Sequence, residues 1–285
     1  MIIYIFIYLI FLRKKKDFKY FFRIIIVGGN NMDTNEKDGF QNEINFANAL
    51  NGKKVKTLLP NFQDMLFQLY GYIDYNAYVF CHVDHTKRKY DIIITIDHQV
   101  KRISIKKGVN NSVHTEGISY FIHFLIECKI PREVIINYLY YHYADGTKNG
   151  KGKNRISSSE YQEKHKNSIE MINQAFNEET VLKKVITRFI LKGTNSVTEI
   201  DGIIYGIPND FLFLLKQDIM NILMSKANIC SKGIHFGSLY CQPKARNLNY
   251  NSKYEKDRFC IQIKWYSIFD DIMECLNYES MKRKR

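Results

Sequence analysis

Residues 89–108, KYDIIITIDHQVKRISIKKG, predict two β-strands joined by a tight polar turn. Isoleucine, valine and threonine are concentrated in both arms, and these branched residues favour strands. The polar run Asp97-His98-Gln99 interrupts the apolar arms, as a hairpin turn does. The stretch therefore predicts an antiparallel hairpin, and the rest of the chain is interpreted around it.

The predicted pairing of the two arms separates apolar from polar side chains. With the turn centred on His98 and Gln99, the residues that lie opposite one another are Asp91 and Lys106, Ile92 and Ile105, and Ile94 and Ile103. Side chains alternate between the two faces of a strand. One face is then apolar, and the other carries Asp91, Arg102, Ser104 and Lys106. A slip of one residue would destroy this separation, so the pattern favours the pairing.

Asp91 and the tripeptide Ser104-Ile105-Lys106 resemble the motif of the PD-(D/E)XK nuclease superfamily. In that superfamily an Asp and a D/E-x-K tripeptide lie on adjacent strands of a restriction-endonuclease-like fold. The resemblance covers about residues 40–130. Tyr90 replaces the proline of the motif. Ser104 replaces the second acid, which is a metal ligand in the family.

Type II restriction enzymes with a small residue at this position are similar, and the following helix supplies the missing carboxylate. In this chain the candidate is Glu116, on a helix predicted from Ser112 to about Glu127. The alternative is that a carboxylate near a helix N-terminus only complements the helix dipole.

The resemblance implies a Mg²⁺ site built from residues of three segments. Its metal ligands would be Asp91, Glu116, the main-chain carbonyl of Ile105 and Glu43, the last on a helix predicted over 42–50. Lys106 would position the attacking water or stabilise charge on the phosphate. Ser104 would lie in the site. The structural alternatives are a cross-strand salt bridge between Asp91 and Lys106 and a solvent-facing Glu43.

The net charge of +13, from 42 basic and 29 acidic residues, favours a polyanionic partner. Backbone N–H groups and polar side chains after the hairpin, and a polar block near the C-terminus, are suited to phosphates and base edges. The residues predicted to bind nucleic acid are Lys107, Asn111, Ser112, His114, Arg246, Gln262 and Lys264. Solvated loops have the same composition, so this set remains a hypothesis.

Three regions are expected along the chain: 1–31, a nuclease core over 32–130, and a helical insertion with a C-terminal α/β part over 131–285. Residues 1–31 contain an apolar run, Ile2 to Leu12, that is too short for a membrane span and is followed, not preceded, by basic residues. We expect this segment to be extraneous, with a weak membrane anchor as the alternative. The six cysteines are scattered, which favours reduced thiols and a cytoplasmic location.

The order of elements predicts a mixed α/β sheet flanked by helices. After the hairpin, helices are expected over 131–144, 157–177, 179–192 and 209–226, with a strand over 201–207 and further strands over 233–242 and 258–265. A polar segment, 146–155, separates the first two of these helices and holds three glycines and four basic residues.

Taken together, these patterns and the resemblance predict a Mg²⁺-dependent DNA endonuclease of the type II restriction class, acting on double-stranded DNA. A homodimer stays open, and the short apolar run of residues 1–31 argues against a membrane partner. Two alternatives stay open: a nucleic-acid-binding protein of the same fold that has lost catalysis with the acid at Ser104, and a membrane-associated protein anchored through residues 1–31.

Overall fold

The structure of the protein, a computed structural model, describes residues 35–86, 88–108, 112–153, 155–194, 196–227, 233–246 and 252–282. The predicted segment 1–31 and Asn111 lie outside the described residues. The chain divides into two compact units, Met1–Asn42 and Glu43–Arg285. Both sheets belong to the second unit.

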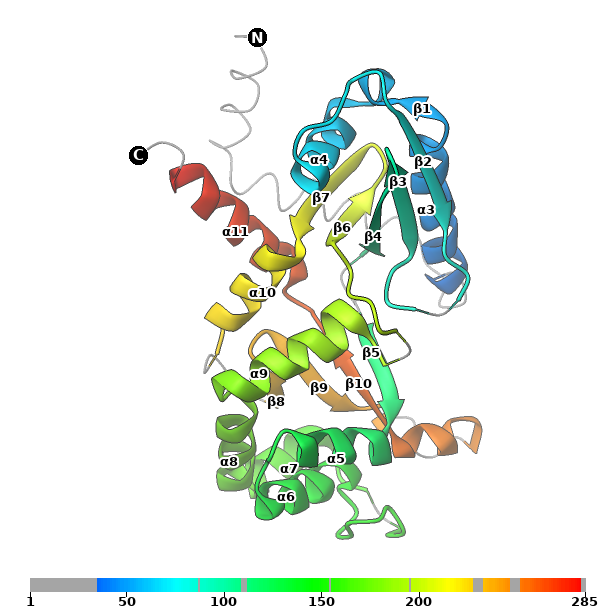
Figure 1. Ribbon diagram of the computed structural model, residues 1–285. Coiled ribbons are helices and arrows are strands. Elements are labelled where there is room, and N and C mark those ends of the chain that lie inside the picture. Colours follow the sequence, from blue (N-terminus) through cyan, green and yellow to red (C-terminus); the bar gives the residue numbers. More distant parts are fainter. Residues whose placement is uncertain are drawn as a thin grey trace, which may run out of the picture. The chain divides into compact units, whose positions relative to one another are not determined.

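The first sheet contains the predicted hairpin and has the strand order β1-β2-β3-β4-β6-β7. Strands β2, β3 and β4 form an antiparallel meander, whereas β4 and β6 run parallel (Figure 1). Parallel neighbours need a long crossover, and here the chain between them includes strand β5 and helices. The strands are β1 Lys53–Lys54, β2 Tyr78–Val83, β3 Ile92–Ile96, β4 Gln99–Lys106, β6 Gly202–Ile207 and β7 Asp210–Leu215.

The second sheet has the order β5-β10-β9-β8, and its neighbouring strands are antiparallel. Its strands are β5 Ser112–Gly117, β8 Ile234–Phe236, β9 Leu239–Pro243 and β10 Cys260–Lys264. The α-helices are α3 Asn35–Leu50, α4 Pro60–Tyr70, α5 Ile118–Glu127, α6 Arg132–Tyr143, α7 Ser158–Lys164, α8 Lys166–Phe176, α9 Glu179–Ile186, α10 Lys216–Ser225 and α11 Ile268–Lys282. Shorter helical turns are η1 Val55–Thr57, the π-helix η2 Thr187–Lys192 and the 3₁₀ segment η4 Ser252–Phe259.

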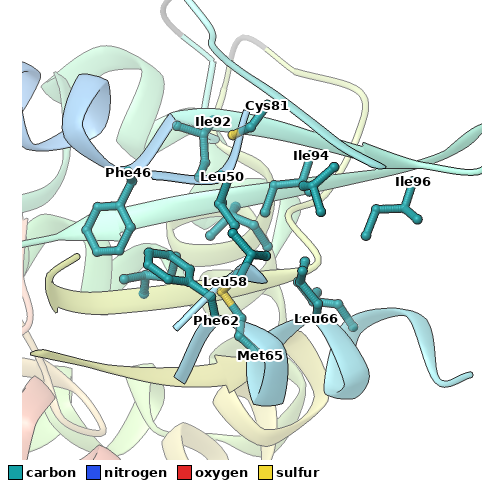
Figure 2. Packing of buried hydrophobic residues seen from close by; sticks show 14 of the residues in the cluster. Phe46, Leu50, Leu58, Phe62, Met65, Leu66, Cys81, Ile92, Ile94 and Ile96 are labelled. Atoms are coloured by element: carbon teal, nitrogen blue, oxygen red, sulfur yellow. The ribbon is translucent and has the colours of Figure 1, made fainter. Parts of the chain in front are cut away.

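A hydrophobic core joins the hairpin to the helices that precede it. The apolar face predicted for the hairpin is buried: Ile92, Ile94 and Ile103 are fully inaccessible to solvent. Figure 2 shows isoleucines of the strands pointing toward Phe46 and Phe62, which come from α3 and α4. Burying aliphatic and aromatic side chains of this size contributes about 1.5–3 kcal/mol each, so this core fixes the hairpin rigidly.

The register of the hairpin differs from the prediction by two residues. Ile92 pairs with Ile103, not with Ile105. The turn consists of Asp97 and His98, which have φ values of 46° and 65°. A two-residue turn with both φ values positive matches the twist of the flanking strands. The predicted pairing is therefore wrong, but the predicted faces are right, because a shift of two returns every side chain to its original face.

The helix predicted over 112–127 is wrong in its first part. Residues Ser112–Gly117 form strand β5, which pairs with β10, and the helix begins only at Ile118. The helix predicted over 209–226 is likewise a strand, β7, followed by α10. In both cases the long-range pairing of the strand outweighs the local helical pattern.

Other predictions of elements are confirmed or refined. Helix α6 matches the one expected over 131–144, and β6 matches the strand expected over 201–207. The segment 157–177 is interrupted at His165 and forms two helices, α7 and α8. The strand expected over 233–242 is a hairpin of β8 and β9.

The predicted fold class is confirmed: a mixed sheet flanked by helices, a helical insertion and a later β-containing part. Among the described residues, no helix combines the length and the apolar character that crossing a membrane requires.

Candidate active site

Asp91 lies at the start of β3, and its carboxylate oxygen Oδ2 accepts several hydrogen bonds from β4. The donors are the hydroxyl of Ser104 at 3.0 Å, the N–H of Ile105 at 2.5 Å and Nζ of Lys106 at 3.4 Å. The N–H of Asp91 donates to the carbonyl of Ile103, which continues the ladder of the hairpin. Ser104, and not Lys106 as predicted, is therefore the residue directly beside Asp91. Among the described residues, none is found to donate to Oδ1, so that oxygen can accept a further ligand.

Lys106 bridges the carboxylate and the main chain of its own strand. Its Nζ also donates to the carbonyl of Ile105 at 2.8 Å. The side chains of Lys106 and Asp91 are 18% and 20% exposed, so both are largely shielded from solvent. Ser104 is fully buried between the strands. An ion pair screened to this extent from water is stronger than an exposed cross-strand salt bridge.

Glu43, on α3, is the second carboxylate near this group. The pKa of its carboxyl group is raised to about 7, first by burial and then by the negative charge of Asp91, whereas Lys106 acts in the opposite direction. Charges act on one another in this way only at short range. The carboxyl group of Glu43 therefore lies close enough to Asp91 and Lys106 for their charges to act on it, and a bound cation would relieve the repulsion between the two carboxylates.

Lys89 is a member of the site that the sequence analysis missed. Its Nζ donates to the carbonyl of Val113 at 2.6 Å. Its pKa is lowered to about 7 by burial and by the charge of Lys106, and Asp91 partly offsets the effect. The sequence did contain an indication of this. Lys89 stands two residues before Asp91, and side chains two residues apart in an extended chain point to the same face.

Glu43, Asp91, Lys89 and Lys106 have the chemistry needed to hold one divalent cation next to a phosphate. Within the described residues, no group of three or more His, Cys, Asp or Glu side chains is arranged to hold a metal. Mg²⁺ does not need such a group, because it is usually bound by one or two carboxylates together with waters and substrate phosphates. Asp91 Oδ1 and the carboxylate of Glu43 are two hard oxygen atoms that could bind the cation. The carbonyl oxygen of Ile105 accepts a hydrogen bond from Lys106. These residues fit Mg²⁺.

The structure places Glu116 in a different setting from the one predicted. It lies on strand β5, not on a helix, and its Oε2 accepts a hydrogen bond from Nη2 of Arg188 at 2.8 Å. His114 Nε2 lies 3.3 Å from the same oxygen, and the ring of His114 stacks on Phe189 of the π-helix. The carboxylate thus has a cationic partner of its own. The charges of Asp91 and Lys106 act on Glu43, whereas Glu116 is paired with Arg188.

Some of the residues predicted to bind nucleic acid lie on the second sheet, and Lys107 lies after β4 of the first. Gln262 donates to the hydroxyl of Ser112 at 3.1 Å, and Lys264 pairs with Ser112 across the second sheet. These three lie on the polar face of β10 and β5, whereas Ile261, Ile263 and Trp265 are buried. Lys107 is exposed just after β4.

Arg246 has a structural setting. It is buried, and its guanidinium donates to the main-chain carbonyl of Tyr141 near the end of α6. A cation at the C-terminus of a helix complements the helix dipole. An exposed arginine on a DNA-binding surface is not what the structure describes at this position.

Comparison with family models and with curated protein sequences finds no match. Among solved structures, the chain is similar to the restriction endonuclease MspI in complex with its cognate DNA. The similarity covers 72% of this chain and 77% of that chain, with 12% identity and a TM-score of 0.46.

Proposed function

We propose that this protein is a Mg²⁺-dependent DNA endonuclease that hydrolyses phosphodiester bonds, with the specificity of a type II restriction enzyme. The observation that carries the proposal is the meeting of Glu43, Asp91 and Lys106 at the end of a rigid hairpin. These are two oxygen ligands and one ammonium group, the set needed to hold a metal ion and stabilise a phosphate that is being cleaved. The resemblance of the Asp91 and Ser104-x-Lys106 spacing to nuclease motifs agrees with it.

Each residue has a distinct role in the proposal. Asp91 would hold the cation through its other carboxylate oxygen, because Oδ2 is fixed by donors from Ser104 and Ile105. Glu43 supplies the second carboxylate and so takes the place of the acid missing at Ser104. Mg²⁺, when bound, supplies Lewis-acid stabilisation of the charge on the phosphate.

Lys106 supplies the ammonium group of the proposed site. Its ammonium group lies between Asp91 and the carbonyl of Ile105, so its position is set by two acceptors rather than by solvent. From there it can stabilise negative charge on the phosphoryl oxygens and orient the attacking water. Because this orientation exists before substrate binds, little of it has to be organised during the reaction.

Double-stranded DNA is the proposed partner. A net charge of +13 favours a phosphate backbone, and the polar face formed by Ser112, Gln262 and Lys264 carries groups suited to hydrogen bonding. Affinity for DNA should therefore fall steeply as the salt concentration rises.

The test is cleavage of supercoiled plasmid by the purified protein, with Mg²⁺ and with EDTA. We expect nicked or linear plasmid only with Mg²⁺, and none from the Lys106→Ala variant. The matched control is Lys101→Ala, which removes the same charge from the same strand at a residue that lies 3.9 Å from Asp201. Equal loss in both variants would refute a specific role for Lys106.

A catalytically inactive DNA-binding protein is the second candidate, and the absence of a carboxylate at Ser104 favours it. The same experiment separates the two. DNA binding by the wild type without cleavage, over a range of DNA sequences and with Mg²⁺ or Mn²⁺, would establish the binding protein and refute the nuclease.

A further inference from the structure

A loop rich in lysine and glycine follows helix α6 and is built around a single buried carboxylate. Residues 146–153, here the basic loop, have the sequence GTKNGKGK and contain no acidic residue. The side chain of Asp145, just before the loop, is fully inaccessible to solvent. Its Oδ1 accepts from the N–H of Thr147 at 2.9 Å and from its hydroxyl at 2.8 Å, and Oδ2 accepts from the N–H of Gly152 at 3.0 Å. One carboxylate thus ties together both ends of the loop.

Arg258 locks the same carboxylate from a distant part of the sequence. Its Nη2 forms an ion pair with Asp145 Oδ2 and donates to the carbonyl of Gly152 at 2.8 Å. Burial alone would raise the pKa of Asp145, but the hydrogen bonds from Thr147 and the pairing with Arg258 hold it below its ordinary value. Asp145 is therefore a permanent anion at the base of the loop.

The glycines of the basic loop allow conformations that other residues would strain. Gly150 has a φ of 72°, and a Cβ atom there would lie 2.6 Å from the ring of Tyr143. A Cβ atom at Gly152 would lie 2.2 Å from the carbonyl oxygen of Asp145. The N–H of Gly150 also donates to the hydroxyl of Thr147 at 3.1 Å. The loop therefore has a defined shape, although it carries no apolar residue of its own.

The side chains that this defined loop presents are cations. Lys148, Lys151 and Lys153 are all exposed. In the described part of the chain, no salt bridge is found for any of them. A fixed backbone that holds three exposed lysines, while the carboxylate at its base is paired with Arg258, presents a concentrated positive charge to solvent, at the cost of the lysines' mutual repulsion. Surface lysines without such support are ordinary, but here the hydrogen bonds around Asp145 fix their spacing.

We propose that the basic loop binds the sugar–phosphate backbone of DNA, and so extends the DNA-binding surface beyond the candidate active site. The inference rests on the proposed function for its choice of polyanion. Lysines form point-charge contacts with phosphates that position DNA without reading its sequence. Because the loop is already ordered by Asp145, binding loses little backbone entropy.

The first experiment compares two triple variants of the full chain by fluorescence anisotropy with a labelled 30-base-pair duplex, in EDTA so that no cleavage occurs. The loop variant changes Lys148, Lys151 and Lys153 to Ala. The control variant changes three exposed lysines on α7, α8 and α9: Lys164, Lys166 and Lys183. Both variants lose the same charge.

We expect the loop variant to bind DNA about tenfold or more weakly at 0.1 M salt, and its salt dependence to be shallower by about 2 to 3 in the log–log slope. The control should keep the slope of the wild type. An unchanged affinity in the loop variant, or equal losses in both variants, would overturn the inference. In either outcome binding by the wild type still stands, so the proposed function survives. A wild type that does not bind DNA would instead refute the proposed function and this inference with it.

The second experiment tests the ordering by Asp145. Asp145→Asn removes a negative charge, so charge alone predicts tighter DNA binding. Loss of the hydrogen bonds that order the basic loop predicts weaker DNA binding instead, and this is the result that we expect. Circular dichroism shows whether the variant is folded. Tighter DNA binding by a folded Asp145→Asn variant would overturn the role given to Asp145. If this variant does not fold, the triple lysine variants alone test whether the basic loop binds DNA.

Discussion

Replacing Glu43 by Gln should make the metal-free protein more stable at neutral and alkaline pH. The folded protein holds the pKa of this carboxyl group at about 7, against an ordinary value of 4.5. A carboxyl group with a raised pKa binds more protons in the folded state, so the stability of the wild type falls as the pH rises from about 4.5 to about 7. The amide side chain of the Glu43→Gln variant carries no charge at any pH, so that decrease should disappear.

The size of the effect follows from the same pKa. Each tenfold change in proton affinity corresponds to about 1.4 kcal/mol, so a rise from 4.5 to about 7 corresponds to about 3 kcal/mol at pH 8. Glu43 is partly exposed, and solvent screening reduces this figure. We therefore expect Glu43→Gln to stabilise the protein by about 1–3 kcal/mol at pH 8 and to have little effect at pH 4.5.

The assay is urea denaturation of both proteins between pH 4.5 and 8.5, in EDTA, with the free energy of unfolding obtained by linear extrapolation. Adding Mg²⁺ at pH 8 should then stabilise the wild type more than Glu43→Gln, because the cation interacts with the ionised carboxylate. A difference between the two proteins that does not change with pH would refute the placement of Glu43 beside Asp91. The matched control is Glu163→Gln, at an exposed carboxylate on α7, which should show no pH-dependent difference.

Three further predictions concern other parts of the chain. Lys89→Met should slow DNA cleavage by on the order of tenfold to a hundredfold while the protein stays folded, because it removes an amine that, with a pKa of about 7, is partly protonated at neutral pH; an unchanged single-turnover rate would exclude Lys89 from the site. Glu116→Ala should cost about 2–4 kcal/mol in urea denaturation, since it leaves Arg188 unpaired at a largely buried position, and an unaltered midpoint would show that the pair contributes nothing. A chain beginning at Met32 should fold and cleave like the full chain, because the described core begins at Phe46; loss of its thermal unfolding transition would contradict this.

The hairpin shows what the sequence can and cannot determine. Alternation of apolar and polar residues correctly assigned the buried face, with Ile92 and Ile103 fully inaccessible. It could not choose between registers that differ by two, because both give the same faces. The choice is made by the turn, where Asp97 and His98 adopt positive φ values without the glycine or asparagine that usually marks such a turn.

Glu116 and Glu43 show the same limit for the site. The helical spacing of apolar residues in α5 is real, but the prediction extended it backwards over Ser112–Gly117, which pairs with β10 about 150 residues later. A strand partner at that separation leaves no mark in the local pattern. Glu43 could be named from the resemblance, but its raised pKa depends on tertiary packing around Asp91 and Lys106.

The most direct test of the account is a pair of carboxamide substitutions, Glu43→Gln and Glu116→Gln, compared in single-turnover cleavage of plasmid DNA with Mg²⁺. Each variant replaces one carboxylate by an amide of nearly equal size, and DNA binding is measured alongside in Ca²⁺ or EDTA. The account predicts that Glu43→Gln binds DNA but does not cleave it, whereas Glu116→Gln still cleaves. An inactive Glu116→Gln together with a fully active Glu43→Gln would contradict it, and would assign the second carboxylate to strand β5 instead of helix α3.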